Sequence, residues 1–142
     1  MTLEQSDPQK ASAWSGPVAR ILVVEDEETV AYHIGRILEK EGYRVDFAED
    51  GRTALELLEK TSYEVMVTDV RMPGMSGIRV LEEAMARFPA TRAIVLTGKP
   101  EIKDAVRSVK KGAVDYLQKP IRSKKLCEAV ERALQAARSV KR

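Results

Sequence analysis

Short aliphatic runs alternate with amphipathic segments along this chain, and this alternation constrains the fold more than any other feature. The aliphatic runs at 21–24, 65–68 and 93–96 are typical of strands that are buried on both faces. Residues 43–48 alternate between polar and apolar, as expected for a less buried strand, and residues 113–117 complete a set of five predicted strands.

Each predicted strand is followed by a segment with the apolar period of a helix. The first runs from about 28 to 41, and Gly42 is expected to end it. The other four helices are indicated by the following apolar positions: Ala54, Leu55 and Leu58; Ile78, Leu81 and Met85; Ile102, Val106 and Val109; and Leu126, Val130 and Leu134. The fourth helix is expected to begin near Pro100 and the fifth near Ser123. Strands and helices in strict alternation predict an α/β fold, a doubly wound parallel sheet with right-handed crossovers and helices on both faces.

Length and composition exclude several classes of protein. A chain of 142 residues with 44% hydrophobic and 32% charged residues is typical of one folded domain. One cysteine and one histidine exclude a disulfide framework and a multi-histidine metal site, and a net charge of +2 is too small to indicate nucleic-acid binding. No apolar run approaches the ~18 residues of a membrane span, and the N-terminus lacks a signal-peptide pattern, so we expect a cytoplasmic protein. Residues 1–19, which include Trp14, have the composition of a flexible N-terminal tail.

Polar residues directly follow four of the five predicted strands. Glu25 and Asp26 follow the first, Asp69 the third, Thr97 the fourth and Lys119 the fifth. In parallel sheets these ends share one edge, so the side chains should converge. Carboxylates about 5 Å apart repel each other by about 3 kcal/mol per pair, which favours a bound cation, and oxygen ligands suit Mg²⁺. Carboxylates, Mg²⁺, a lysine and a hydroxyl together indicate a site for a phosphoryl group, with one carboxylate as a potential nucleophile.

Four segments resemble the receiver domain of two-component response regulators. They are 21–27 (ILVVEDE), 67–77 (VTDVRMPGMSG), 95–98 (VLTG) and 112–120 (GAVDYLQKP), in the order and spacing of that family. The resemblance implies a flavodoxin-like fold with strand order 2-1-3-4-5. It also implies a phospho-accepting regulatory domain over residues 20–142, which is a signalling switch rather than an enzyme.

The resemblance also implies a role for each residue at the strand ends. Asp69 is the expected phosphoacceptor, which takes a phosphoryl group from a histidine kinase or a phosphotransfer protein. Glu25 and Asp26 are the expected acidic pair for Mg²⁺, with Asp26 as a direct ligand and Glu25 acting through water. Asp69 and the backbone carbonyl of Arg71 are expected to complete the metal shell.

Three further positions are expected to act on the phosphoryl group or to respond to it. Thr97 and Lys119 are each expected to bind a phosphoryl oxygen, and Tyr116 to turn inward when Thr97 moves. The Lys119–Pro120 peptide bond is expected to be cis. Arg71 and Lys99 lie two residues past Asp69 and Thr97, and we expect them to bind or shield the phosphoryl group.

Two other functions are considered and disfavoured. A phosphatase or phosphotransferase with a nucleophilic aspartate generally carries Asp-x-Asp after its first strand, whereas this chain has Glu25-Asp26-Glu27 there. A flavin-binding protein needs a Gly/Ser/Thr-rich loop that cradles a phosphate at that position, and these acidic residues would repel one.

The resemblance further implies an output surface made by the fourth helix, the fifth strand and the fifth helix. Its expected partner is an output domain, another protein or a second copy in a phospho-dependent homodimer. Relatives joined to winged-helix domains pair there through a charged network. This chain keeps Asp115 but has Val114, Ala129 and Ala136 at network positions, so any dimer is expected to depend on apolar contacts. Whether an output domain follows Arg142 is left open, as are the cognate kinase and the regulated process.

Overall fold

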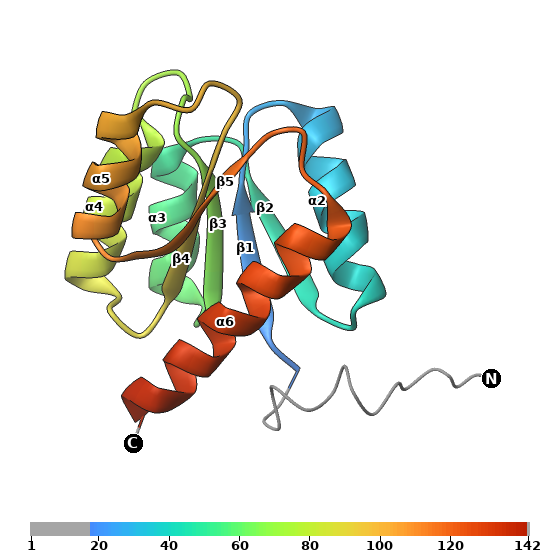
Figure 1. The fold of residues 1–142 in the computed structure, drawn as a ribbon. Coiled ribbons are helices and arrows are strands. Elements are labelled where there is room, and N and C mark those ends of the chain that lie inside the picture. The colour runs from blue at the N-terminus through green and yellow to red at the C-terminus, as the bar shows by residue number, and fades with distance from the viewer. Residues whose placement is uncertain (1–17, 142) are drawn as a thin grey trace.

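The computed structural model describes residues 18–141, so most of the predicted tail, including Trp14, lies outside the described residues. The strands are β1 (Arg20–Val24), β2 (Arg44–Ala48), β3 (Val65–Asp69), β4 (Arg92–Thr97) and β5 (Ala113–Gln118). The helices are α2 (Glu28–Lys40), α3 (Gly51–Lys60), α4 (Gly77–Arg87), α5 (Ile102–Lys110) and α6 (Ser123–Lys141). The strands form one parallel sheet in the order β2-β1-β3-β4-β5, which confirms the predicted fold (Figure 1).

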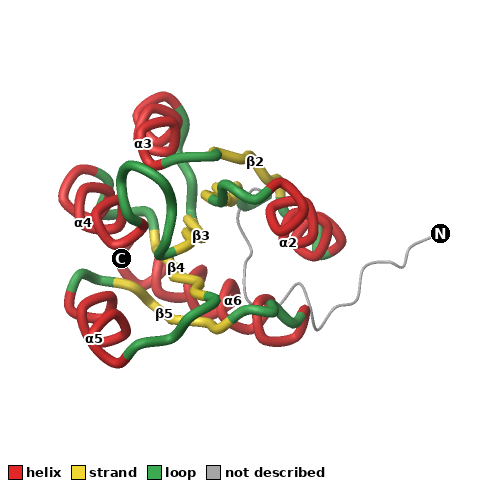
Figure 2. The backbone as a smooth tube through the Cα atoms, turned by 90° about the horizontal axis from the view of Figure 1, so that it is seen from above, coloured by secondary structure: helices red, strands yellow, loops and turns green. Residues whose placement is uncertain are grey.

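Helices cover both faces of the sheet. Seen from above, α2 and α6 lie on one side of the strands, and α3, α4 and α5 lie on the other (Figure 2). The aliphatic run in β1 serves both layers because successive side chains of a strand point to opposite faces. Ile21 and Val23 pack with the α2 and α6 layer, whereas Leu22 and Val24 pack with the other. This two-sided burial explains why the central strands have unbroken aliphatic sequences.

Helix α5 differs from its predicted arrangement. It begins at Ile102 rather than near Pro100, because Glu101 has an extended backbone and occupies the N-cap position. Its apolar positions are also exposed, although an apolar stripe ordinarily faces the core. Ile102, Val106 and Val109 are 85%, 48% and 62% exposed. The helix instead turns the fully buried Ser108 inward, with the Ser108 hydroxyl donating to the Asp104 carbonyl.

Gly77 brings the first turn of α4 against the end of β3. The Gly77 N–H donates to the Val70 carbonyl oxygen at 2.8 Å. A Cβ atom at this position would lie 1.7 Å from the Asp69 carbonyl oxygen and 2.8 Å from Val70 Cα. Both obstacles are backbone atoms, so no rotamer change can relieve the clash. The close approach fixes the backbone that carries Asp69.

Replacing Gly77 by alanine should therefore destabilise the protein. We expect Gly77→Ala to lower the free energy of unfolding by about 2 kcal/mol or more, since the added methyl group must displace the backbone of Asp69. Urea denaturation followed by circular dichroism measures this. Gly98→Ala is the matched control, because a Cβ there meets only Lys119 Cδ at an ordinary 3.8 Å. Equal stabilities of the two variants would contradict the interpretation.

Candidate functional site

The register of the strands brings the predicted site residues to one edge of the sheet. Val24 pairs with Thr68, so that Glu25 and Asp69, the next residues along, leave β1 and β3 side by side. Asp69 in turn pairs with Leu96, the residue before Thr97. Thr97 pairs with Gln118, the residue before Lys119. Four chain segments far apart in sequence thus end together.

Lys119 joins two of the carboxylates directly. Its Nζ donates to Glu25 Oε1 at 2.9 Å and to Asp69 Oδ2 at 3.1 Å. Both carboxylates are almost completely buried, with Glu25 3% and Asp69 5% exposed. The Lys119 ammonium group therefore compensates carboxylate charge that is removed from water. The Lys119–Pro120 peptide bond is cis, as the sequence resemblance implies.

Burial and hydrogen bonding act against each other on these groups. Burial raises the pKa of Glu25 above its usual value, although hydrogen bonds from Lys119 and from the Glu27 N–H oppose this. Burial alone would lower the pKa of Lys119, but its hydrogen bonds to Glu25 and Asp69 raise that pKa above its usual value. Lys119 is accordingly held in its charged form.

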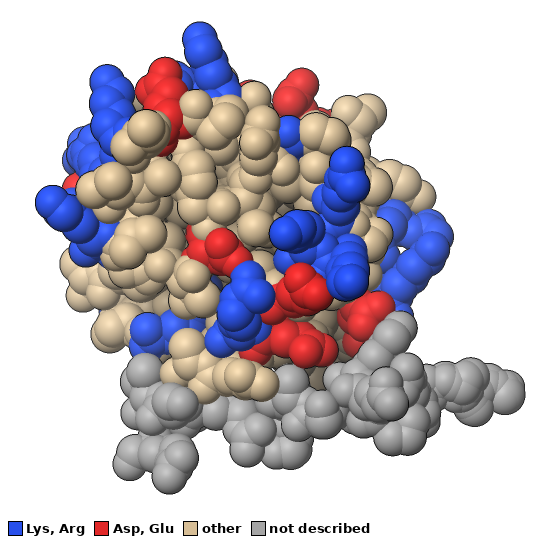
Figure 3. All heavy atoms as spheres, in the orientation of Figure 1, with Lys and Arg blue, Asp and Glu red and all other residues tan. Residues whose placement is uncertain are grey.

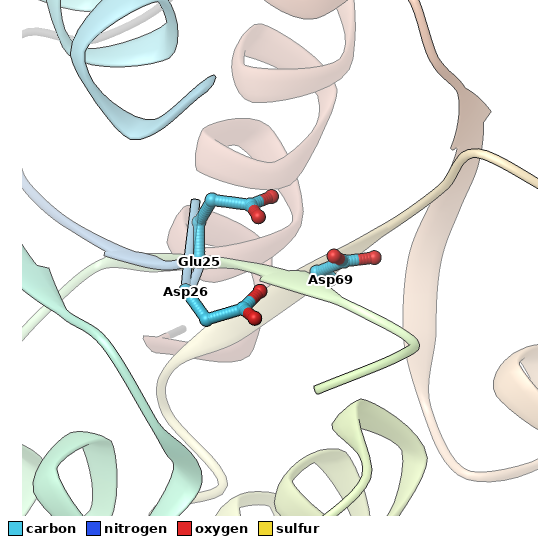
Figure 4. A group of neighbouring side chains, drawn as sticks. All are labelled: Glu25, Asp26 and Asp69. Atoms are coloured by element: carbon cyan, nitrogen blue, oxygen red, sulfur yellow. The ribbon is translucent and has the colours of Figure 1, made fainter. Parts of the chain in front are cut away.

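Three carboxylates gather closely enough to share a metal ion. Glu25, Asp26 and Asp69 each offer an oxygen, and these oxygens lie within 4.8 Å of one another (Figure 4). Asp26 is exposed, unlike the other two. An all-oxygen, highly charged donor set fits Mg²⁺, a hard cation that keeps several waters. The donor chemistry therefore fits the metal expected from the sequence.

Thr97 is the last residue of β4, next to this cluster, and Tyr116 lies on β5. Thr97 is fully buried, and its Oγ1 accepts a hydrogen bond from the Lys99 N–H at 3.0 Å. Its hydroxyl proton remains available for donation, since the bond uses only an oxygen lone pair. Tyr116 is half-buried, and its hydroxyl oxygen lies 3.5 Å from the N–H of Glu101, at the start of α5.

Arg71 reaches away from the carboxylate cluster. Its backbone N–H lies 3.4 Å from Asp69 Oδ1, which keeps it beside the expected phosphoacceptor. Its guanidinium group contacts Glu101 at 3.4 Å and Asp104 at 3.8 Å, both near the N-terminus of α5. Sequence reasoning did not identify Glu101 as part of this neighbourhood. The sequence does contain one indication: Glu101 directly follows Pro100, at the expected start of a helix. Acidic residues are favoured at such a position, which lies near the ends of the strands.

Comparisons with known proteins identify the family of the chain. The family model described as "Response regulator receiver domain" matches residues 21–131. Regulatory protein AtoC of Escherichia coli K12 is 36% identical over 118 residues, which cover 83% of this chain but 26% of AtoC. The chain thus spans about a quarter of the length of this relative.

Solved structures show the same similarity over whole domains. A response regulator receiver domain protein from Clostridium thermocellum is 32% identical with a TM-score of 0.82, and the match covers 87% of this chain and 99% of that chain. The beryllofluoride-activated NtrC4 receiver domain dimer is 33% identical with a TM-score of 0.79, and the match covers 83% of this chain and 98% of that chain. Because the family model covers most of the sequence and the fold and strand order agree, the chain belongs to the response regulator receiver domain family.

Proposed function

We propose that this domain accepts a phosphoryl group on Asp69 and thereby switches the conformation of a signalling output. The observation that carries the proposal is the position of Lys119 Nζ, which lies within 3.1 Å of Asp69 and bridges it to Glu25. A buried carboxylate can act as a nucleophile toward phosphorus. The cation beside it would then compensate the negative charge of the phosphoryl group.

The proposed donor is a phosphorylated histidine of a histidine kinase or a phosphotransfer protein. A carboxylate oxygen of Asp69 attacks phosphorus, the phosphorus–nitrogen bond breaks, and the imidazole nitrogen leaves with the bonding electron pair. Lys119 and the Thr97 hydroxyl then donate hydrogen bonds to phosphoryl oxygens. The domain catalyses no reaction on an external substrate in this proposal, and it acts in the cytoplasm.

Mg²⁺ is the proposed cofactor. Glu25, Asp26, Asp69 and the backbone carbonyl of Arg71 would hold it. When bound, the metal neutralises negative charge that develops on the phosphoryl oxygens. The three clustered carboxylates support this assignment, since Lys119 alone supplies one positive charge against three negative ones.

Phosphorylation of Asp69 can be measured directly. With a small phosphodonor and Mg²⁺, we expect the wild-type protein to acquire one phosphoryl group that is stable in acid and labile in base. Asp69→Asn should acquire none, because an amide is not nucleophilic, and wild type should acquire far less in excess chelator. Intact mass spectrometry checks all three results. Equal uptake by wild type and Asp69→Asn would contradict the assignment.

The metal assignment has its own test in two neighbouring acidic residues. Asp26→Ala should weaken Mg²⁺ binding by about tenfold or more, because it removes a direct ligand. Glu27→Ala is the matched control, since Glu27 is an exposed acid at the N-cap of α2 that lies outside the carboxylate cluster. A magnesium titration followed by tyrosine fluorescence compares them. If the Glu27 variant loses more affinity than the Asp26 variant, the site is placed wrongly.

The proposed switch runs from Thr97 to Tyr116. Movement of Thr97 toward the phosphoryl group would release the Lys99 N–H and leave space for the Tyr116 ring. Tyr116 contacts Glu101, so its movement would reach the start of α5. The phosphoryl group would thus bias an equilibrium between two arrangements of α5 and β5.

The proposed output surface is the face formed by α5, β5 and α6. Its apolar part is the exposed stripe of Ile102, Val106 and Val109. In Figure 3 a largely uncharged area lies between basic side chains at the left edge and mixed charges over α6. Asp115 is paired with Arg132 of the same chain. We propose that an output domain, an output protein or a second copy packs against the apolar stripe.

A second copy on this face should associate through apolar contacts. Analytical ultracentrifugation of the beryllofluoride-treated protein should detect a dimer that persists as salt is raised, because apolar burial is not screened. Val106→Glu should abolish the dimer. Val18→Glu, which places the same charge at another exposed valine, should not. A dimer that dissociates in high salt, or one that tolerates Val106→Glu, would contradict the apolar interface.

Within residues 18–141, no helix combines the length and the apolar character that a bilayer crossing requires.

A further inference from the structure

We infer that Arg71, Glu101 and Asp104 form an electrostatic latch that holds the first turn of α5 until Asp69 is phosphorylated. Arg71 would release the two carboxylates of α5 and bind the phosphoryl group instead. The inference rests on the proposed function and adds a second route from Asp69 to α5, separate from the one through Thr97.

The latch connects the loop after β3 to the first turn of α5. Arg71 belongs to the loop after β3, and its N–H lies 3.4 Å from Asp69 Oδ1. Its guanidinium group lies 3.4 Å from Glu101 Oε2 and 3.8 Å from Asp104 Oδ2. Arg71, which contacts α5, is therefore only two residues from Asp69, so a change of charge at Asp69 acts close to it.

Glu101 is the point at which both routes meet. Its carboxylate forms an ion pair with the Arg71 guanidinium group, and its backbone N–H faces the hydroxyl oxygen of Tyr116 at 3.5 Å. The N-cap residue of α5 thus contacts Arg71, in the loop after β3, and Tyr116, the expected switch aromatic. Loss of the contact with Arg71 would make it easier for Glu101 to move with Tyr116.

The contact has the properties of a reversible link. The side chains of Arg71 and Glu101 are 53% and 36% exposed, and an ion pair in such surroundings contributes little to stability. A phosphoryl group offers up to two negative charges and three acceptor oxygens, and a planar guanidinium group binds such a group in bidentate fashion. The phosphoryl group is therefore the stronger competitor for Arg71.

The hollow beside the latch has basic groups that favour the exchange. It has a volume of about 650 Å³ and lies between the loop after β3 and α5. Lys103 and Arg107 line it together with the two acids. When Arg71 leaves, Lys103 and Arg107 still line the same hollow as Glu101 and Asp104, although Arg107 also pairs with Glu82 at 3.5 Å.

The test uses beryllofluoride with Mg²⁺ as the phosphoryl analogue and amide chemical shifts as the readout. Glu101→Gln removes the nearer of the two ion-pair partners of Arg71, so it should tighten beryllofluoride binding by about two- to fivefold. It should also move the α5 amides of the untreated protein toward their beryllofluoride-bound positions. Arg71→Ala keeps the backbone carbonyl but removes the guanidinium group, and should weaken binding at least about fivefold.

The double variant separates a latch from a general loss of negative charge. In the Arg71→Ala background, Glu101→Gln should give no gain in affinity, because no guanidinium group is left to be freed. Glu83→Gln is the matched control, since Glu83 pairs with Arg79 within α4 at similar exposure, and it should bind like wild type. Asp104→Asn should change the affinity in the same direction as Glu101→Gln.

Each outcome decides one point. If Glu101→Gln binds beryllofluoride like wild type, or if its gain persists without Arg71, the latch is wrong while the proposed function stands. If wild type binds no beryllofluoride and takes up no phosphoryl group, the proposed function is wrong and the latch is wrong with it.

Discussion

The mutual repulsion of carboxylates at one end of the sheet, and its compensation by Lys119, is the interaction on which the site depends. Glu25 and Asp69 are almost fully buried, where like charges repel most strongly and water cannot screen them. The Lys119 ammonium group lies within 3.1 Å of both and partly offsets this cost. The remaining negative charge makes this edge of the sheet receptive to a divalent cation.

This compensation requires the sheet register to be kept. Lys119 reaches Asp69 only because Thr97 pairs with Gln118 and Asp69 pairs with Leu96. A shift of one residue in either pairing would turn the lysine to the opposite face of the sheet. The buried aliphatic side chains on both faces of β3 and β4 oppose such a shift, so the hydrophobic core also sets the geometry of the charged site.

Features encoded by neighbouring residues could be predicted from the sequence. The run Ile21–Val24 and the acids after it already indicated a buried strand with a charged end, and the parallel topology required those ends to converge. The orientation of α5 could not be predicted in this way, because the exposure of Val106 depends on how the helix packs against α4 and β5. The contact of Arg71 with Glu101 was inaccessible for the same reason, since the two residues lie thirty positions apart and meet only in the folded chain.

Helix α5 contributes no side chain to either of the two hydrophobic clusters that the other four helices help to form. Its fully buried residue is Ser108, and its large apolar residues, Ile102, Val106 and Val109, are exposed. Local opening of such a helix exposes little apolar surface, so its free energy of opening lies well below that of global unfolding. Backbone amides of α5 would then exchange with solvent deuterium through partial opening, while those of β1 and β3 await complete unfolding. The domain thus combines a buried, hydrogen-bonded charged site with one helix whose position costs little free energy to change.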